Sequence, residues 1–202
     1  MADENVFEVG ATMAGHYGAS ARTGVTLAET TFAGAWNVQG DARRPELGAA
    51  VRTLFALSLP EHPNSSAREG ACTALWIGPG SWLIVASDES TRTDFEVKRD
   101  ALNAAGGALF DVSAGRVGWT IVGSEARAVL AKGCPLDFGP RAFGEGTCAQ
   151  SVFGRINALF YRHGGASEFT MMVARSFARD AWRSLCLSAA QYGYDVLHPR
   201  PF

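Results

Sequence analysis

The chain has 202 residues, 47% of them hydrophobic, which is enough for one sizeable core or two smaller ones. Its 18 Lys and Arg residues against 20 Asp and Glu residues give a net charge of −2, with no cationic excess to neutralise a phosphate backbone. We therefore expect no nucleic-acid partner. The acidic start MADENVFEVG is unlike a secretory signal, and no apolar run reaches the ~18 residues of a membrane span, so we expect a cytoplasmic protein without membrane attachment.

Residues 1–24 are predicted to form a flexible N-terminal arm. From Gly10 to Gly24 the sequence is mainly Gly, Ala, Ser and Thr, which bury too little apolar surface to form a core. Residues 25–202 are predicted to form a single α+β domain. Two intertwined lobes, over about 25–107 and 108–202, are the alternative organisation.

The segment after the arm changes from strand to helix periodicity. Trp36 and Val38 alternate with polar neighbours, as a half-buried strand requires. Apolar residues then recur at helical spacing after Pro45, and Pro60 ends the pattern. We predict extended segments over 25–38, a helix between the two prolines and a surface loop over 59–70.

The rest of the chain repeats one arrangement three times, a predicted hairpin followed by a predicted helix. The strand pairs are 71–77 with 81–86, 108–112 with 116–122, and 148–163 with 168–174. The helices follow from a capping box at Thr93 and Glu96, an N-cap at Ser124, and a start at Ser176. These units predict an α+β fold with ferredoxin-like hairpin-plus-helix units and antiparallel or mixed sheets.

Two glycine-rich segments invite comparison with nucleotide-binding loops. Gly78-Pro79-Gly80 precedes a predicted strand rather than a helix, so we predict a hairpin turn. The segment from Gly144 to Ala149 fits the looser dinucleotide pattern, with Glu168 at about the distance of a ribose-binding acid. Because a loop with a proline precedes it, we interpret the match as coincidence and keep dinucleotide binding only as a minor alternative.

Aromatic and cationic residues supply the candidates for a subunit interface. Trp76 and Trp82 flank the predicted turn, where they would either pack as a cross-strand pair or anchor an interface. Arginines at 155, 162, 175, 179 and 183 are either solvated charges or an electrostatic docking surface for a larger acidic subunit. The residues selected as interface candidates are Trp36, Trp76, Trp82 and Arg116.

The sequence offers no convergent catalytic group. It contains neither G-x-S-x-G nor H-E-x-x-H, and its four histidines fall in the arm, a loop, a hairpin tip and the tail. Its four cysteines are far apart, without zinc-site spacing, and are predicted to be reduced and mostly buried. No catalytic, cofactor-binding or metal-ligating residue is therefore predicted on this chain.

Three blocks of the sequence resemble a known family. Residues 36–86, from WNVQGDARRPEL to LWIGPGSWLIVA, are similar to the amino-terminal half of the gamma subunits of heterotetrameric sarcosine oxidase. In that family a QG strand, a helix, an LP-x-x-PN loop and an L-W-L-G-P-x-x-W-L-L hairpin follow in this order. Residues 111–138 and 175–185 resemble later blocks of the same family.

The resemblance implies a fold similar to the T-protein of the glycine cleavage system. It implies an oxidoreductase of four different subunits that oxidises sarcosine to glycine, gives the one-carbon unit to tetrahydrofolate or releases formaldehyde, and forms hydrogen peroxide. The gamma chain would be a non-catalytic partner of the alpha, beta and delta subunits. Those subunits would carry FAD, FMN, NAD, tetrahydrofolate and zinc, while this chain would bind no cofactor and have no activity of its own.

A second hypothesis is an independent folate-binding, aminomethyltransferase-like domain. Relatives of this fold carry a K-G-C-x-x-G-Q-E signature. Here Lys132-Gly133-Cys134 is followed by Pro135-Leu136-Asp137, without the Gln and Glu, which puts the folate motif in doubt. A helix end capped by Lys132 and Gly133 explains the triplet as well.

Overall fold

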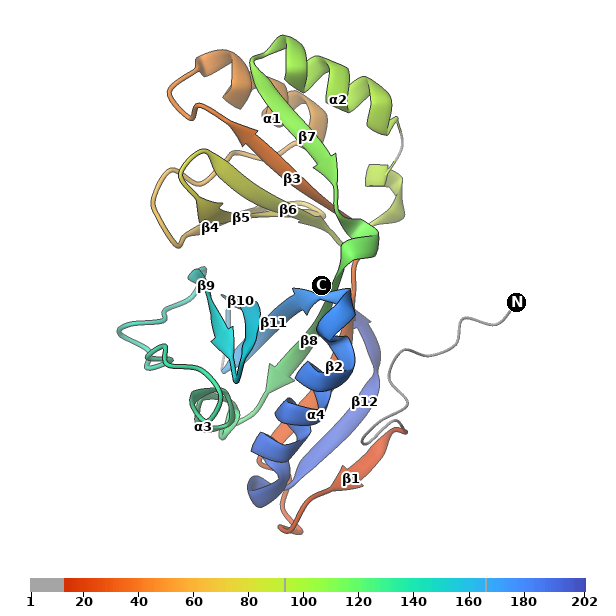
Figure 1. Cartoon of the computed structure of the whole chain (residues 1–202), viewed down its shortest axis with the longest axis vertical. Coiled ribbons are helices and arrows are strands. Elements are labelled where there is room, and N and C mark those ends of the chain that lie inside the picture. The colour runs from red at the N-terminus through yellow and green to blue at the C-terminus, as the bar shows by residue number, and fades with distance from the viewer. Residues whose placement is uncertain (1–12, 93, 166) are drawn as a thin grey trace, which may run out of the picture. The chain divides into compact units, whose positions relative to one another are not determined.

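The computed structural model describes residues 13–92, 94–165 and 167–202, and the chain divides into two compact units (Figure 1). Unit 1 contains the chain up to Thr30 together with Gly115–Glu145 and Gln150–Arg200. Unit 2 contains Thr31–Ala114, Gly146–Ala149 and Pro201–Phe202. The main change of unit, after Ala114, lies seven residues beyond the boundary considered for two lobes, and the chain passes between the units several times.

Unit 2 is an antiparallel five-stranded sheet with two helices. The strand order is β4-β5-β6-β3-β7. The elements are β3 (Gly34–Gly40), α1 (Pro45–Phe55), β4 (Ser66–Glu69), β5 (Cys72–Gly78), β6 (Ser81–Ala86), the 3-10 turn η1 (Glu89–Arg92), α2 (Phe95–Ala104) and β7 (Gly107–Asp111). Leu47 and Val51 of α1 and Leu102 of α2 join alternate residues of the strands in one buried cluster. The predicted helix after Pro45 is therefore confirmed, because its apolar stripe has a sheet face to cover.

Unit 1 is built on a seven-stranded sheet in the order β1-β12-β2-β8-β11-β10-β9. A few end residues of its strands, Thr31, Cys148, Ala149 and Pro201, belong to unit 2. Its elements are β1 (Gly15–Tyr17), β2 (Val25–Thr31), β8 (Arg116–Val122), α3 (Ala126–Ala131), β9 (Cys148–Phe153), β10 (Ile156–Arg162), β11 (Glu168–Ala174), η3 (Arg175–Phe177), α4 (Ala178–Ala189), η4 (Ala190–Tyr192) and β12 (Tyr194–Pro201). Helix α4 lies across the sheet, with Trp182 stacked on Trp119 of β8 at a centroid distance of 5.9 Å (Figure 1). The apolar residues of α4 recur at helical spacing, and the side of the helix that carries them is buried.

The predicted hairpin of 108–112 with 116–122 is wrong. β7 pairs with β3 in the five-stranded sheet, whereas β8 pairs with β2 and β11 in the seven-stranded sheet. The residues between them form the 3-10 turn η2 (Ser113–Gly115), in which Asp111 Oδ1 accepts hydrogen bonds from the Ser113 amide at 2.8 Å and hydroxyl at 2.6 Å. Asp111 thus caps its own turn, and the two strands it separates find partners elsewhere.

The other two predicted hairpins are confirmed, with one change. β5 pairs with β6, and β10 pairs with β11. The long strand predicted over 148–163 is instead two strands, β9 and β10, because Gly154 has a φ of +63° and turns the chain between them.

All three predicted helix starts differ from the structure. The start predicted at Ser176 lies within the 3-10 turn η3, and α4 begins at Ala178. α3 begins at Ala126, and its N-cap residue is Glu125 rather than Ser124. The Glu125 amide donates instead to the Gly24 carbonyl at 3.1 Å, a partner from a distant segment. Thr93 of the predicted capping box lies outside the described residues, and α2 begins at Phe95 with no side-chain capping hydrogen bond.

Part of the predicted N-terminal arm is placed by backbone pairing. Residues 1–12 lie outside the described residues. Beyond them, β1 pairs antiparallel with β12, and His16 Nδ1 lies 2.6 Å from Asp195 Oδ1. Tyr17 stacks on Tyr194 with a centroid distance of 5.6 Å. Residues 15–17 therefore differ from the expected loose arm. Although only three residues long, β1 adds a strand to the edge of the sheet beside β12.

Candidate functional site

The described residues contain no obvious reaction centre. Within 13–92, 94–165 and 167–202, no three histidine, cysteine, aspartate or glutamate side chains come together where they could hold a metal ion. None of the helices in these ranges is long and apolar enough to cross a membrane. The features that remain are the sequence motifs, a small pocket and the exposed faces.

Three of the four interface candidates gather in the core of unit 2. Trp36 is 2% exposed and Trp82 is 1% exposed, and both belong to the cluster beneath α1 and α2. Trp76 lies directly opposite Trp82 across the hairpin and is half-buried against the same cluster. The cross-strand pair is confirmed. Trp36 and Trp82 leave no side-chain surface for another subunit, contrary to the interface prediction, because a buried sheet face selects tryptophan as readily as an interface does.

The remaining interface candidates keep some exposure. Trp76 is half-buried, and Arg116, the first residue of β8, is likewise only partly exposed opposite Ala174 of β11. Their role at a subunit interface stays a prediction.

A small pocket lies beside Trp82 in unit 2. Trp82 Nε1 donates to the Pro60 carbonyl at 2.9 Å, which fixes the loop after α1 against the sheet. The pocket has a volume of about 130 Å³, and Arg52 and Glu61 are its charged lining residues. Ligand pockets for drug-sized molecules are roughly 300–1,000 Å³, so this pocket is too small for a folate or a dinucleotide.

Gly78-Pro79-Gly80 forms the hairpin turn that the sequence predicts. Gly80 has a φ of +65°, and its carbonyl accepts a hydrogen bond from the Gly40 amide at 2.9 Å. A Cβ on Gly80 would lie 2.5 Å from the Gly40 carbonyl oxygen. The second glycine is therefore needed for close approach of two backbones, and the segment opens a strand rather than a phosphate-binding helix.

The second glycine motif also leads into a strand. Gly146 has a φ of +73°, and its carbonyl accepts from Ser66 Oγ at 2.7 Å. The Cys148 amide, at the start of β9, donates to the Asn64 carbonyl at 2.9 Å. Glu168 follows the motif at about the sequence spacing expected of a ribose-binding acid, but it forms an ion pair with Arg200. The dinucleotide pattern thus lacks the helix N-terminus that would bind a pyrophosphate.

The Lys-Gly-Cys triplet joins two helices of unit 1. Lys132 Nζ donates to the Ser188 carbonyl at 2.7 Å and lies 4.5 Å from the centre of the Tyr192 ring. A Cβ on Gly133 would lie 2.5 Å from the Phe153 ring, and Cys134 is 5% exposed. The lysine thus caps the carboxyl end of α4 rather than that of its own helix, α3.

His163 is the polar residue that sequence reasoning placed least well. It was expected at an exposed hairpin tip, but it is 7% exposed, and its Nε2 lies 2.7 Å from Thr170 Oγ1. Its ring packs edge-on against Tyr161 with a centroid distance of 4.5 Å. Strict alternation from Leu159 through Tyr161 could have indicated this burial, because it places His163 on the same face of the strand.

The four cysteines are free and buried, as predicted. Burial raises the pKa of the Cys148 thiol to about 12, and its Sγ lies 3.2 Å from the Ser65 carbonyl. A thiol in this state is protonated near neutral pH and is a poor nucleophile.

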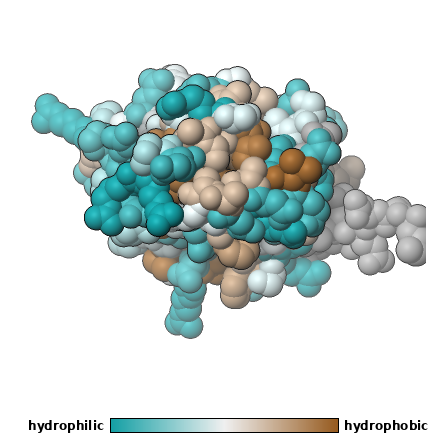
Figure 2. Space-filling view, turned by 90° about the horizontal axis from the view of Figure 1, so that it is seen from above, coloured by the Kyte–Doolittle hydropathy of each residue, from teal (hydrophilic) through white to brown (hydrophobic). Residues whose placement is uncertain are grey.

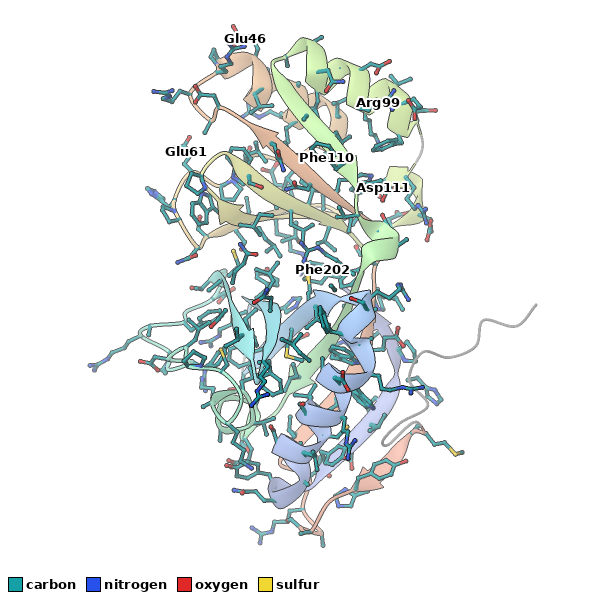
Figure 3. All side chains as sticks on the ribbon, in the orientation of Figure 1. Glu46, Glu61, Arg99, Phe110, Asp111 and Phe202 are labelled. Carbon is teal, nitrogen blue, oxygen red and sulfur yellow. The ribbon has the colours of Figure 1, made fainter. Side chains whose placement is uncertain are left out.

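Exposed apolar side chains mark the surfaces available to a partner. The described residues with large exposed hydrophobic side chains are Met13, Val97, Phe110, Phe177, Leu187 and Leu197. Phe110 projects from the end of β7, an edge strand (Figure 3). On one face of the molecule, apolar surface gathers among hydrophilic side chains (Figure 2). Phe177 and Leu187 flank the exposed side of α4.

Comparisons with known proteins agree with these features. The model of the sarcosine oxidase, gamma subunit family matches residues 39–191. A sarcosine oxidase subunit gamma from Arthrobacter sp is 34% identical over 151 residues, covering 73% of this chain and 71% of that protein. The subunit gamma from Corynebacterium sp. (strain U-96) is 32% identical over 147 residues, covering 71% and 69%.

Two solved structures share the fold. Heterotetrameric sarcosine oxidase from Corynebacterium sp. U-96, in complex with pyrrole 2-carboxylate, matches with a TM-score of 0.73 and 24% identity, over 85% of this chain and 87% of that one. The glycine cleavage system aminomethyltransferase T from Bartonella henselae matches with a TM-score of 0.58 and 16% identity, over 88% of this chain but 48% of that one. The predicted α+β, T-protein-like fold is confirmed.

Proposed function

This chain belongs to the sarcosine oxidase, gamma subunit family, and we propose that it is the non-catalytic gamma subunit of a heterotetrameric sarcosine oxidase. The observation that carries the proposal is the family match over residues 39–191, supported by relatives 32–34% identical that bear this name. The match includes the whole of α1, of the β5-β6 hairpin and of α4.

The complex would oxidise sarcosine, which is N-methylglycine, to glycine. When the methyl carbon leaves as formaldehyde, water would supply its oxygen; when tetrahydrofolate takes up this carbon, no water would be consumed. In both cases dioxygen would accept two electrons and two protons to form hydrogen peroxide. We infer that FAD, FMN, NAD, tetrahydrofolate and zinc are held by the alpha, beta and delta subunits. The contribution of the gamma chain is then to the assembly of the complex.

The contacts of the motif residues support a scaffold role. Lys132 binds the end of α4, Gly80 approaches Gly40, and Asp111 caps its own turn. Each of these polar or special residues already has a packing or hydrogen-bonding task within its unit. The alternative of an independent folate-binding domain has no comparable support, because the residues of its motif are used in joining α3 and α4.

The test is to purify the tagged chain gently from its native cell. We expect three further polypeptides by mass spectrometry, flavin bands in the visible spectrum, and hydrogen peroxide release when sarcosine is added. A colourless chain that purifies alone would contradict the proposal. In that case, saturable binding of tetrahydrofolate to the isolated chain, measured by calorimetry, would support the folate-binding alternative.

A further inference from the structure

We propose that the exposed face of α4 and its preceding turn is the surface through which this chain docks onto an acidic, partly apolar groove of a larger subunit. The surface consists of Phe177, Arg179, Arg183 and Leu187, and we call it the α4 stripe. This inference rests on the proposed function and adds to it the face that binds and the chemistry of the partner's surface.

The α4 stripe follows the geometry of a single helix. Arg179, Arg183 and Leu187 are spaced four residues apart, so their side chains lie one above another along one side of α4. All three are exposed, Leu187 to 67%. Phe177, 48% exposed, extends the surface beyond the first turn. From Phe177 to Leu187 the helix rises about 15 Å, enough to form the centre of one side of an interface.

The two arginines of the α4 stripe are exposed and unpaired within the part of the chain that the structure describes. Among the described residues, neither Arg179 nor Arg183 forms an ion pair or a hydrogen bond. Asp180 lies beside them but forms no ion pair with either in the same part of the chain. Arg179 also lies in the first turn of α4, where the helix dipole opposes a positive charge. Neither arginine therefore stabilises the helix that carries it. Carboxylates on a partner would form charge-assisted hydrogen bonds with both guanidinium groups.

The opposite side of α4 is buried in unit 1. Trp182 and Leu185 are buried against the sheet, together with alanines one turn away. The helix is therefore held in place by its inner side, and its outer side projects Phe177 and Leu187 from a fixed backbone. Two unpaired cations with an exposed apolar group on either side match a partner surface in which carboxylates lie between apolar pockets.

The first experiment co-expresses the tagged chain with the other subunits of its complex and measures the subunits retained per chain. In Arg179→Glu/Arg183→Glu we expect the apparent affinity for the complex to fall at least tenfold, and in the parent chain we expect binding to weaken as salt is added. The matched control is Arg52→Glu/Arg68→Glu, which reverses two exposed arginines of unit 2 and should assemble normally. Equal thermal unfolding of the three chains would show that all are folded.

A second measurement identifies what touches the stripe. A photoreactive phenylalanine at Leu187 should cross-link to one of the larger subunits, at a peptide containing Asp or Glu residues, and the same group at Arg52 should not. Assembly unaffected by the stripe variant, or a cross-link to a second copy of this chain, would overturn the inference while leaving the proposed function intact. Failure of the parent chain to assemble with any subunit would overturn both.

Discussion

The two units of the molecule form their ion pairs in different ways. In unit 2 the pairs join residues one to three positions apart, namely Asp41 with Arg43, Glu89 with Arg92, and Arg99 with Glu96 and Asp100. In unit 1 two pairs among the described residues join distant segments, His16 with Asp195 and Glu168 with Arg200. The ion pairs of unit 2 join neighbouring residues on the surface and add little to its stability. The ion pairs of unit 1 join residues that are distant in the sequence and close together only in the folded chain.

The largest expected effect concerns the turn of unit 2. Gly80→Ala should destabilise the protein by about 2–4 kcal/mol, because its left-handed backbone and the nearby Gly40 carbonyl both exclude a Cβ. Gly78→Ala, in the same turn, should change stability by less than about 0.5 kcal/mol, because its Cβ would have 4.0 Å to the nearest atom. Urea unfolding followed by tryptophan fluorescence measures both. Equal effects would show that the close approach of Gly80 to Gly40 is absent in solution.

Each unit contains a buried tryptophan, and the two differ in the hydrogen bonding of their indole nitrogens. Trp82 Nε1 donates to the Pro60 carbonyl, whereas Trp182 Nε1 is buried without a hydrogen-bond partner in the part of unit 1 that the structure describes. Trp82→Phe should therefore be about 1–2 kcal/mol more destabilising than Trp182→Phe, since it removes a hydrogen bond and leaves a carbonyl unpaired. The same urea experiment tests this, and a larger loss at Trp182 would contradict it.

The ion pairs themselves differ in their response to pH. The hydrogen bond to Asp195, and then that to the Ser20 carbonyl, raise the pKa of His16 above 6.5. The stabilisation from His16 is therefore complete below its unfolded pKa and is lost as pH rises through its raised folded pKa. The Arg43 hydrogen bonds lower the pKa of Asp41 to about 2, so this local pair keeps its contribution above the ordinary carboxyl pKa and loses it only in strong acid.

Between pH 6 and 8, β1 should thus loosen while the Asp41 pair stays unchanged. Hydrogen exchange of the residue 15–17 amides, corrected for intrinsic rates, should become faster at pH 8. In Asp195→Asn the His16 pKa, followed by NMR, should return toward 6.5. A His16 pKa unchanged by this substitution would show that the long-range pair does not form.

The smallest difference between the units is expected at their cysteines. Cys72 and Cys148 belong to unit 2, Cys134 and Cys186 belong to unit 1, and all four are buried. Because burial raises the pKa of Cys148 to about 12, only about 1 in 10,000 protein molecules has this thiol ionised at pH 8. A thiol-reactive dye should label none of the four quickly in the folded protein and all four in urea. Rapid labelling of one cysteine would identify the unit that opens first.

Patterns within short stretches of the sequence predicted the structural features that depend on neighbouring residues. The helix after Pro45, the β5-β6 hairpin and the buried side of α4 follow from periodicity and turn chemistry within about fifteen residues. The turn at Gly78-Pro79-Gly80 and the facing positions of Trp76 and Trp82 followed from the same patterns.

Features that depend on distant partners were missed. β7 and β8 have strand periodicity but pair in different sheets, and no local signal distinguishes this from a hairpin. The amide of Glu125, the N-cap residue of α3, donates to the distant Gly24 carbonyl, and the burial of His163 is accompanied by its contact with Thr170. The interface assignments of Trp36 and Trp82 failed for a different reason, since tryptophan is enriched both in cores and at interfaces.

The position of β12 between β1 and β2 has a consequence for synthesis. β2 leaves the ribosome long before its neighbour β12, because every element from β3 to α4 is made between them. At about 5–20 residues per second, the nascent chain must hold β2 without this partner for roughly 10–30 s. Unit 2 likewise awaits Pro201 and Phe202. Neither unit can therefore be completed before β12 is made, and until then the unpaired backbone edge of β2 is accessible to chaperones or co-translated subunits.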